Sequence, residues 1–329
     1  MNAKNYFTLP LLAFAVFLSP LQAETIPKDL LAGWSLKLDS GEPAWMRVVE
    51  QNGIAIVYMR LHVGPDGPWQ VIEVTDGRLK FAMDRKRKKN APTAPPMVEV
   101  ELKDGKLEGT IVRTPKKGDV ETTHFTGKRF PDMPKAPDLS KVTFGHPISL
   151  FNGKDMTGWR PHESDKINGW SVKEGLLVNE TTKTDFSATG AYANLRTDTE
   201  FEDFWLHIDF LVEAKRNSGV YLRGMYEAQV VDRDSPMQGI QGVGAIFGHI
   251  APSINAGKPG GQWQSYDLTL VDRHVTVVLN GVKVIDNQPV WGPTGGAVYT
   301  DPGAPGPIHL QGDHTAVKYR NIYLAPVVK

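Results

Sequence analysis

Polar and ionisable side chains alternate with apolar ones along residues 217–232. Successive side chains of a strand point to opposite faces, so this alternation predicts a β-hairpin with one apolar and one polar face. The apolar face collects Val220, Leu222, Ala228 and Val230. The polar face collects Tyr221, Arg223, Glu227 and Gln229. These four polar groups suit a ligand rich in hydroxyls, although a solvated face with a cross-strand ion pair has the same composition.

The register of this hairpin is predicted by grouping its apolar side chains over a core. That grouping places Arg223 opposite Glu227 and Tyr221 opposite Gln229. Residues 224–226 then form a three-residue loop. We therefore expect Arg223 and Glu227 to be neighbours on the polar face.

The N-terminal residues and the overall charge indicate where the protein acts and which partners it does not bind. Residues 1–23 combine Lys4, an apolar run and a small residue at Ala23, which predicts a signal peptide and export to the periplasm or the extracellular space. The chain has no cysteine, so an exported form depends on its apolar core rather than on disulfides. The 37 basic and 37 acidic residues cancel, which argues against a nucleic-acid partner. No later segment is predicted to span a membrane.

Short alternating runs bounded by glycine and proline predict an all-β protein. Residues 24–130 read as a small antiparallel domain, either barrel-like or a sandwich. A proline-rich linker follows over residues 131–142. Residues 143–329 hold many further strands and predict a two-sheet sandwich. The long glycine-rich stretch at 239–261 is predicted to be a functional loop.

Several ordered motifs in the second domain resemble the 3-keto-disaccharide hydrolase domain family. They occupy residues 151–159, 217–223, 226–232, 261–267 and 306–314. The resemblance covers about residues 145–327 and does not extend to the first domain. It implies a concanavalin A-like, laminin G-like jelly roll. It also implies cleavage of glycosides oxidised to a ketone at C3, by hydrolysis or by elimination followed by hydration.

A ketone at C3 acidifies the hydrogen at C2, so such a reaction needs a base, a stabiliser for the enolate oxygen and an acid for the leaving group. Arg223 is predicted to stabilise the oxyanion, because it is a permanent cation with several donors. Glu227 and His314 are the candidates for base and acid, in either order. Asp313 and Asp232 are the candidates to orient a histidine.

The remaining candidates are predicted to contact the substrate. Amides suited to ring hydroxyls, an aromatic ring suited to stacking and further polar contacts are supplied by Asn217, Gln229, Gln311, Trp263, Tyr221, Gln262, Asp232 and Asp313. The family often has glutamate where this chain has Gln262, so no base is expected there. The anomer and aglycone preferences stay open.

A catalytic metal is an alternative to the arginine, and a structural Ca²⁺ is a further option. The candidate ligands are His249, His309, His314, Asp232 and Glu227, but no spacing among them is diagnostic. Two other functions also stay open. The protein could be a non-catalytic carbohydrate-binding protein, or an adhesion module in which the first domain is the active part. The expected partner is an oligosaccharide or glycoside, and the oligomeric state is left undetermined.

Overall fold

The computed structural model describes residues 26–62, 64, 66–84, 94–115, 117–181 and 190–328. The predicted signal peptide lies outside these residues. Within them, the helices are three single 3₁₀ turns, η1 (Lys28–Leu30), η2 (Leu139–Lys141) and η3 (Gly239–Gln241). None of the helices in these ranges is long and apolar enough to cross a membrane. The prediction of an all-β fold is confirmed.

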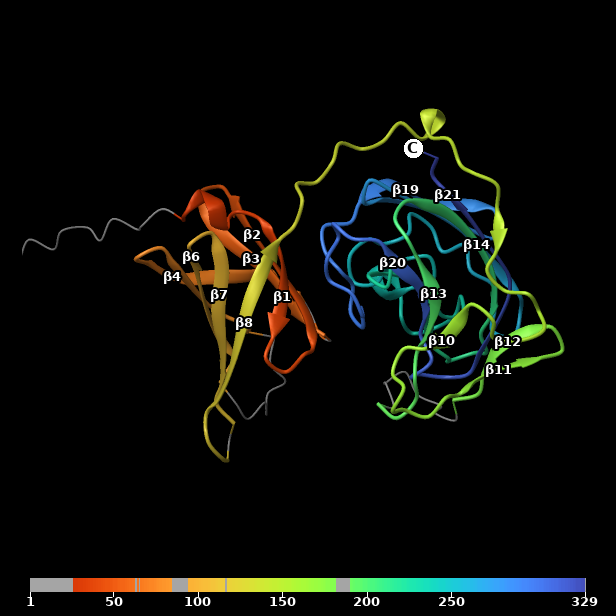
Figure 1. The fold of residues 1–329 in the computed structure, drawn as a ribbon, viewed down its shortest axis with the longest axis horizontal. Coiled ribbons are helices and arrows are strands. Elements are labelled where there is room, and N and C mark those ends of the chain that lie inside the picture. The colour runs from red at the N-terminus through yellow and green to blue at the C-terminus, as the bar shows by residue number, and fades with distance from the viewer. Residues whose placement is uncertain are drawn as a thin grey trace, which may run out of the picture.

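The first eight strands close into an antiparallel barrel, on the left of Figure 1. They are β1 (Gly33–Leu38), β2 (Pro43–Gln51), β3 (Ile54–Leu61), β4 (Trp69–Thr75), β5 (Arg78–Ala82), β6 (Met97–Lys103), β7 (Lys106–Arg113) and β8 (Glu121–Arg129). Alternate side chains fill the interior, as Val57 and Met59 of β3 do. The predicted Asp76-Gly77 turn joins β4 to β5 with both residues at positive φ, which is the geometry that suits the right-handed strand twist.

The second half of the chain forms two stacked sheets, on the right of Figure 1. The five-stranded sheet has the order β10 (Trp159–Pro161), β13 (Leu195–Phe201), β20 (Gly306–Leu310), β15 (Ser218–Leu222) and β16 (Tyr226–Val230). The eight-stranded sheet has the order β11 (Trp170–Lys173), β12 (Leu176–Asn179), β21 (Val317–Pro326), β14 (Phe204–Leu211), β17 (Gln264–Val271), β18 (His274–Leu279) and β19 (Val282–Pro289), with β9 (Ile148–Ser149) paired to β21. The predicted jelly-roll sandwich is confirmed.

The core of the sandwich lies between the two sheets. Leu206, Ile208 and Phe210 of β14 face Val220 and Leu222 of β15 across one continuous cluster of buried apolar side chains. Burying each such side chain stabilises the fold by about 1.5–3 kcal/mol. The apolar face predicted for residues 217–232 is therefore confirmed, and its polar face points away from the core.

The hairpin of β15 and β16 has a different register from the one predicted. Tyr221, not Arg223, lies opposite Glu227, and the loop is residues 223–225. A shift of two residues keeps every side chain on its face, so the apolar pattern does not distinguish the two registers. The observed one places Arg223 in the turn, at φ +56° beside Gly224 at φ +63°. Its guanidinium there reaches two backbone carbonyls of the loop that follows β19.

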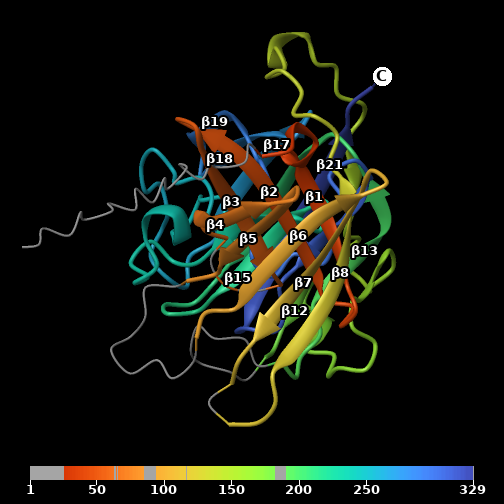
Figure 2. The same cartoon turned by 90° about the vertical axis from the view of Figure 1, so that its left-hand side faces the viewer.

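The barrel docks on the sandwich through this same loop, residues 290–305, which Figure 1 shows in blue between the two parts. The guanidinium of Arg47 lies 3.7 Å from the centre of the Trp291 ring. The hydroxyls of Ser35 and Thr300 are 2.8 Å apart. The backbone N–H of Gly296 donates to the carbonyl of His62 at 3.0 Å. Figure 2 shows the barrel strands from their own side, with the sandwich behind them.

Candidate active site between the barrel and the jelly roll

A cavity of about 760 Å³ lies where the polar face of the five-stranded sheet meets the barrel. The sandwich lines it with Asn217, Glu227, Gln229, His309, Gln311, Asp313 and His314, among others. The barrel contributes Arg60, His62 and Asp66. This volume is within the range of about 300–1,000 Å³ typical of small-molecule sites.

Two polar rows cross the sheet at the base of the cavity, because the registers of four strands align them. One row runs Glu227, Tyr221, His309 and Arg196. The next row runs Gln229, Gly219 and Gln311, with the backbone N–H of Gln311 donating to the Gly219 carbonyl at 3.0 Å. Residues from distant parts of the chain thus present hydrogen-bonding groups to one space.

Glu227 is a buried carboxyl group whose side chain is 3% exposed. Burial raises its pKa to about 8, although the Tyr221 hydroxyl and the charge of Arg60 oppose this rise. Its backbone N–H donates to the Thr294 hydroxyl at 3.0 Å, and its carbonyl accepts from Phe247 N–H at 2.9 Å. Glu227 is therefore a fixed group that carries a proton at neutral pH and can donate it.

Gly219 leaves the room that the Glu227 side chain occupies. A Cβ at position 219 would lie 2.3 Å from Glu227 Oε1. We expect Gly219→Ala to lower the free energy of unfolding by about 1–3 kcal/mol, because the crowded strand or the carboxyl group must move. Urea unfolding measures this. Gly145→Ala is the control, because its Cβ would lie no nearer than 3.5 Å to any neighbour. Equal stability of the two variants would contradict the packing argument.

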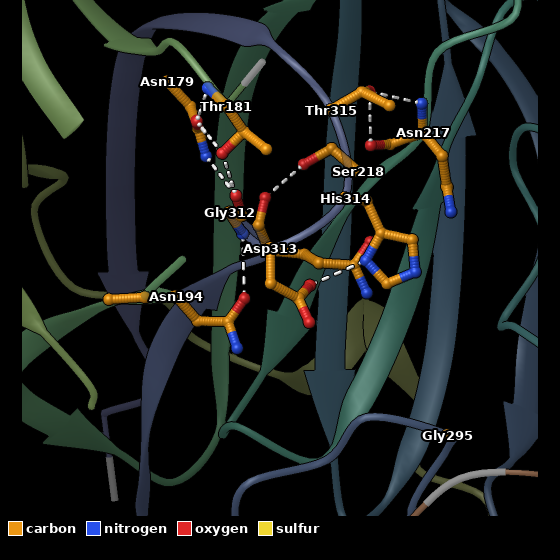
Figure 3. Close-up of polar contacts among 12 residues, drawn as sticks. Asn179, Thr181, Asn194, Asn217, Ser218, Gly295, Gly312, Asp313, His314 and Thr315 are labelled. Atoms are coloured by element: carbon orange, nitrogen blue, oxygen red, sulfur yellow. Dashed lines mark hydrogen bonds and ion pairs between the residues drawn. The ribbon is translucent and has the colours of Figure 1, made fainter. Parts of the chain in front are cut away.

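Asp313 and His314 form a pair at the rim of the cavity, with 2.6 Å between Asp313 Oδ1 and His314 Nδ1 (Figure 3). The segment is held from both sides. Before it, Gly312 N–H donates to Asn194 Oδ1 and its carbonyl accepts from Asn179 Nδ2. After it, the Thr315 hydroxyl bonds the backbone N–H and carbonyl of Asn217. Asp313 thus fixes the orientation of the His314 ring at the cavity.

His309 stands in the middle of the sheet and is buried beneath the cavity. Burial holds its pKa well below the ordinary value, and the nearby His162, Arg196 and His62 add to this effect. Its ring lies edge-on to Tyr221, with 4.8 Å between centroids. Neither ring nitrogen has a hydrogen-bond partner among the described residues. A neutral imidazole with both nitrogens free offers one donor and one acceptor to a ligand.

The cavity also contains amide oxygens without protein partners. Asn217 Oδ1 and Gln311 Oε1 are buried, and neither has a hydrogen-bond partner within the described part of the chain. Gln311 Nε2 donates to the Tyr221 hydroxyl at 3.2 Å, and Gln229 Nε2 donates to the Gln241 carbonyl at 3.2 Å. The amides of Gln311 and Gln229 are thus held in place, and Asn217 and Gln311 retain an acceptor for a ligand hydroxyl.

Two residues of the predicted site have other roles in the structure. Arg223 does not line the cavity, so the expectation that it stands beside Glu227 is wrong. Its buried guanidinium donates to the carbonyl of Pro302 at 2.8 Å and to that of Ala304. Asp232 accepts from the backbone N–H groups of Lys215 at 3.0 Å and Asp234 at 3.1 Å, so it caps turns beside the strand. Neither lies near His314 in the cavity lining.

Gln262 and Trp263 also lie away from the cavity. Gln262 is exposed, and the Trp263 ring is covered by the guanidinium of Arg320, 4.0 Å from its centre. Trp263 therefore makes a cation–π contact with a neighbouring strand and does not have the predicted stacking role in the cavity. The predicted site residues that the cavity does bring together are Asn217, Glu227, Gln229, Gln311, Asp313 and His314, with Tyr221 in the sheet row beneath.

The candidate metal ligands are not gathered into one centre. Across the described ranges, no group of three or more histidine, aspartate and glutamate side chains has an arrangement that could hold a metal ion. His249 instead lies with its Nε2 3.2 Å from Asp66 Oδ2, and His314 is paired with Asp313.

The second half of the chain matches a known protein family. Residues 146–325 match the family described as 3-keto-alpha-glucoside-1,2-lyase-like domain. The chain belongs to this family. The lyase-like domain is thus the jelly roll, and all the cavity residues outside the barrel belong to it. Membership supports a carbohydrate-active function for this protein.

Comparison with solved structures finds β-sandwich proteins. Two candidate glycosyl hydrolases from Parabacteroides distasonis are 21% and 27% identical, cover 55% and 58% of this chain and 94% and 92% of their own, and give TM-scores of 0.44 and 0.43. SCLam, a non-specific endo-β-1,3(4)-glucanase from family GH16, is 12% identical, covers 59% of this chain and 93% of its own, and gives 0.35. A comparison with curated sequences found no match.

Proposed function

We propose that this protein is an exported enzyme that cleaves 3-keto glycosides by removing the proton at C2. The observation that carries the proposal is that a candidate proton donor and a candidate base line one cavity of sugar size. Glu227 has a pKa raised to about 8 and holds a proton, while His314 lines the same cavity and is oriented by Asp313 through Nδ1. A proton-carrying carboxyl group and an oriented imidazole in one cavity are typical of acid–base catalysis. Residues 1–23 are the proposed export signal.

In the proposed reaction, His314 takes the proton from C2 and the electron pair of that bond forms the enolate of the C3 ketone. When the ketone re-forms, the C1–O bond breaks and its electron pair leaves with the glycosidic oxygen. Glu227 gives its proton to that oxygen. The products are the free aglycone and a sugar with a double bond between C1 and C2. Addition of water to that double bond gives the 3-keto sugar, so elimination and net hydrolysis share these steps.

The remaining polar groups support binding of a sugar. The side-chain oxygens of Asn217 and Gln311 can accept hydroxyl hydrogens. Neutral His309 offers one N–H donor and one acceptor nitrogen. Buried groups that lack protein partners are costly unless a ligand or water satisfies them. A ligand with several hydroxyls in fixed geometry meets that requirement.

The test is a comparison of a 3-keto disaccharide with its unoxidised parent, with released sugar as the readout. The proposal predicts release from the keto form alone, because only that form has an acidic hydrogen at C2. Binding of either sugar without release would favour a carbohydrate-binding protein instead. Release from the parent at an equal rate would contradict the proton-abstraction route.

A further inference from the structure

The outer surface of the barrel carries two side chains that are buried where the barrel meets the lyase-like domain. Trp45 and Arg60 lie opposite each other on β2 and β3, on the face that points away from the barrel core. Their exposed fractions are 3% and 4%. A tryptophan and an arginine rarely reach such burial on the outside of a barrel, so the docking of the two domains is what covers them.

Glycines of the lyase-like domain leave the space that these side chains fill. A Cβ at Gly292 would lie 2.5 Å from the Trp45 ring, and a Cβ at Gly295 would lie 2.7 Å from Arg60 Nη1. Gly248, on the glycine-rich loop, would place its Cβ 3.4 Å from Arg60 Nη2. The barrel and the loops around the cavity are therefore shaped for each other, and the guanidinium of Arg60 passes between two of those loops.

Arg60 enters the cavity as a held but unsaturated cation. Its Nη2 is 3.4 Å from Asp66 Oδ2 and 3.5 Å from His249 Nε2. Burial alone would raise the pKa of Asp66, but the hydrogen bond from His249 and the charge of Arg60 lower it. Arg60 Nε is buried and has no hydrogen-bond partner among the described residues. The guanidinium contacts of Arg60 are also long, whereas Arg223 Nη2 donates to the Pro302 carbonyl at 2.8 Å.

We propose that the barrel is part of the active site and that Arg60 is the cation that stabilises the enolate oxygen of the substrate. This inference rests on the proposed function. It assigns to Arg60 the role that the sequence suggested for Arg223. The C3 oxygen gains negative charge when the C2–H bond breaks and loses it when the C1–O bond breaks. A guanidinium already positioned at the cavity stabilises that transient charge with little reorganisation.

The test compares Arg60→Gln with Arg47→Gln in the full-length protein. Arg47 belongs to the same barrel face and packs on Trp291, but it does not line the cavity. We expect Arg60→Gln to lower kcat/KM for a 3-keto disaccharide about 100- to 1,000-fold, mostly in kcat, as loss of an oxyanion donor does. We expect Arg47→Gln to change kcat/KM less than about fivefold, because it removes only a cation–π contact outside the cavity. Thermal unfolding of both variants reports on the interface.

A second variant separates catalysis from domain docking. Arg60→Ala leaves a gap that free guanidinium ions can enter, so we expect millimolar guanidinium to restore part of the lost kcat. Activity of Arg60→Gln equal to that of Arg47→Gln would overturn the assignment. So would an Arg60→Ala defect that guanidinium does not relieve. If the unsubstituted protein releases no sugar from the 3-keto disaccharide, the proposed function has failed instead, so the two failures are distinguishable.

Discussion

Glu227→Gln is expected to make the protein more stable and almost inactive. The pKa of Glu227 is raised from 4.5 to about 8 in the folded protein. Between these two pH values the folded state keeps a proton that the unfolded state releases, so the stability of the native protein falls as pH rises through this window. Glutamine fills the same space and carries no such cost. The expected gain in the free energy of unfolding at pH 7 is about 3 kcal/mol.

The same substitution removes the proposed proton donor, so kcat is expected to fall about 100- to 10,000-fold. In the unsubstituted protein the protonated form is the active one, and we expect kcat to decline as pH rises above about 8. Urea unfolding at pH 5 and pH 8 measures the stability difference, which should be larger at pH 8. Glu180→Gln is the control, because Glu180 is half exposed in an ion pair with Lys173. A destabilised Glu227→Gln variant would contradict the raised pKa.

Asp313→Asn is expected to leave the fold intact and to lower kcat about 100-fold or more. Asp313 Oδ1 is 2.6 Å from His314 Nδ1, so it keeps a proton on that nitrogen and leaves the other one free as a base. An asparagine can offer an N–H to Nδ1 instead, which favours the wrong tautomer. The measurement is kcat together with the rate at which the C2 hydrogen of the substrate is lost to solvent. Both should fall together.

Asp232→Asn is the matched control for this prediction. Asp232 also follows a strand, and it is buried, but its oxygens accept backbone N–H groups outside the cavity. We expect it to lower stability by about 1–2 kcal/mol, because hydrogen bonds to a charged acceptor are weakened, and to change kcat only a few-fold. A larger loss of kcat in Asp232→Asn than in Asp313→Asn would mean that the wrong carboxylate has been assigned.

The alternation of residues 217–232 was sufficient to predict which side chains share a face, because side-chain direction is a local property of a strand. It was not sufficient to predict the register. Grouping of the apolar side chains is unchanged by a two-residue shift, and the contacts that decide between the registers come from the loop at 290–305, about 70 residues downstream. The sequence could therefore place Glu227 on the polar face but not Arg223 in the turn.

The contribution of the barrel could not be predicted from the chain for a related reason. The alternation of β3 distinguishes inward Met59 from outward Arg60, but it carries no information about what covers the outward face. The signal that does exist is the set of glycines at 292, 295 and 248, and it has meaning only once the facing side chains are known. Trp263 lies in a family motif, yet it packs under Arg320 and does not line the cavity.

The most direct test of the account uses a 3-keto disaccharide labelled with deuterium at C2 of the keto sugar. Our account predicts that every cleavage event transfers this label to solvent, and that cleavage is slower than with the unlabelled substrate when proton removal limits the rate. Asp313→Asn should slow label loss and sugar release equally. Release of a sugar that still carries the deuterium at C2 would contradict the central claim, because the glycosidic bond would then have broken without proton abstraction in the cavity.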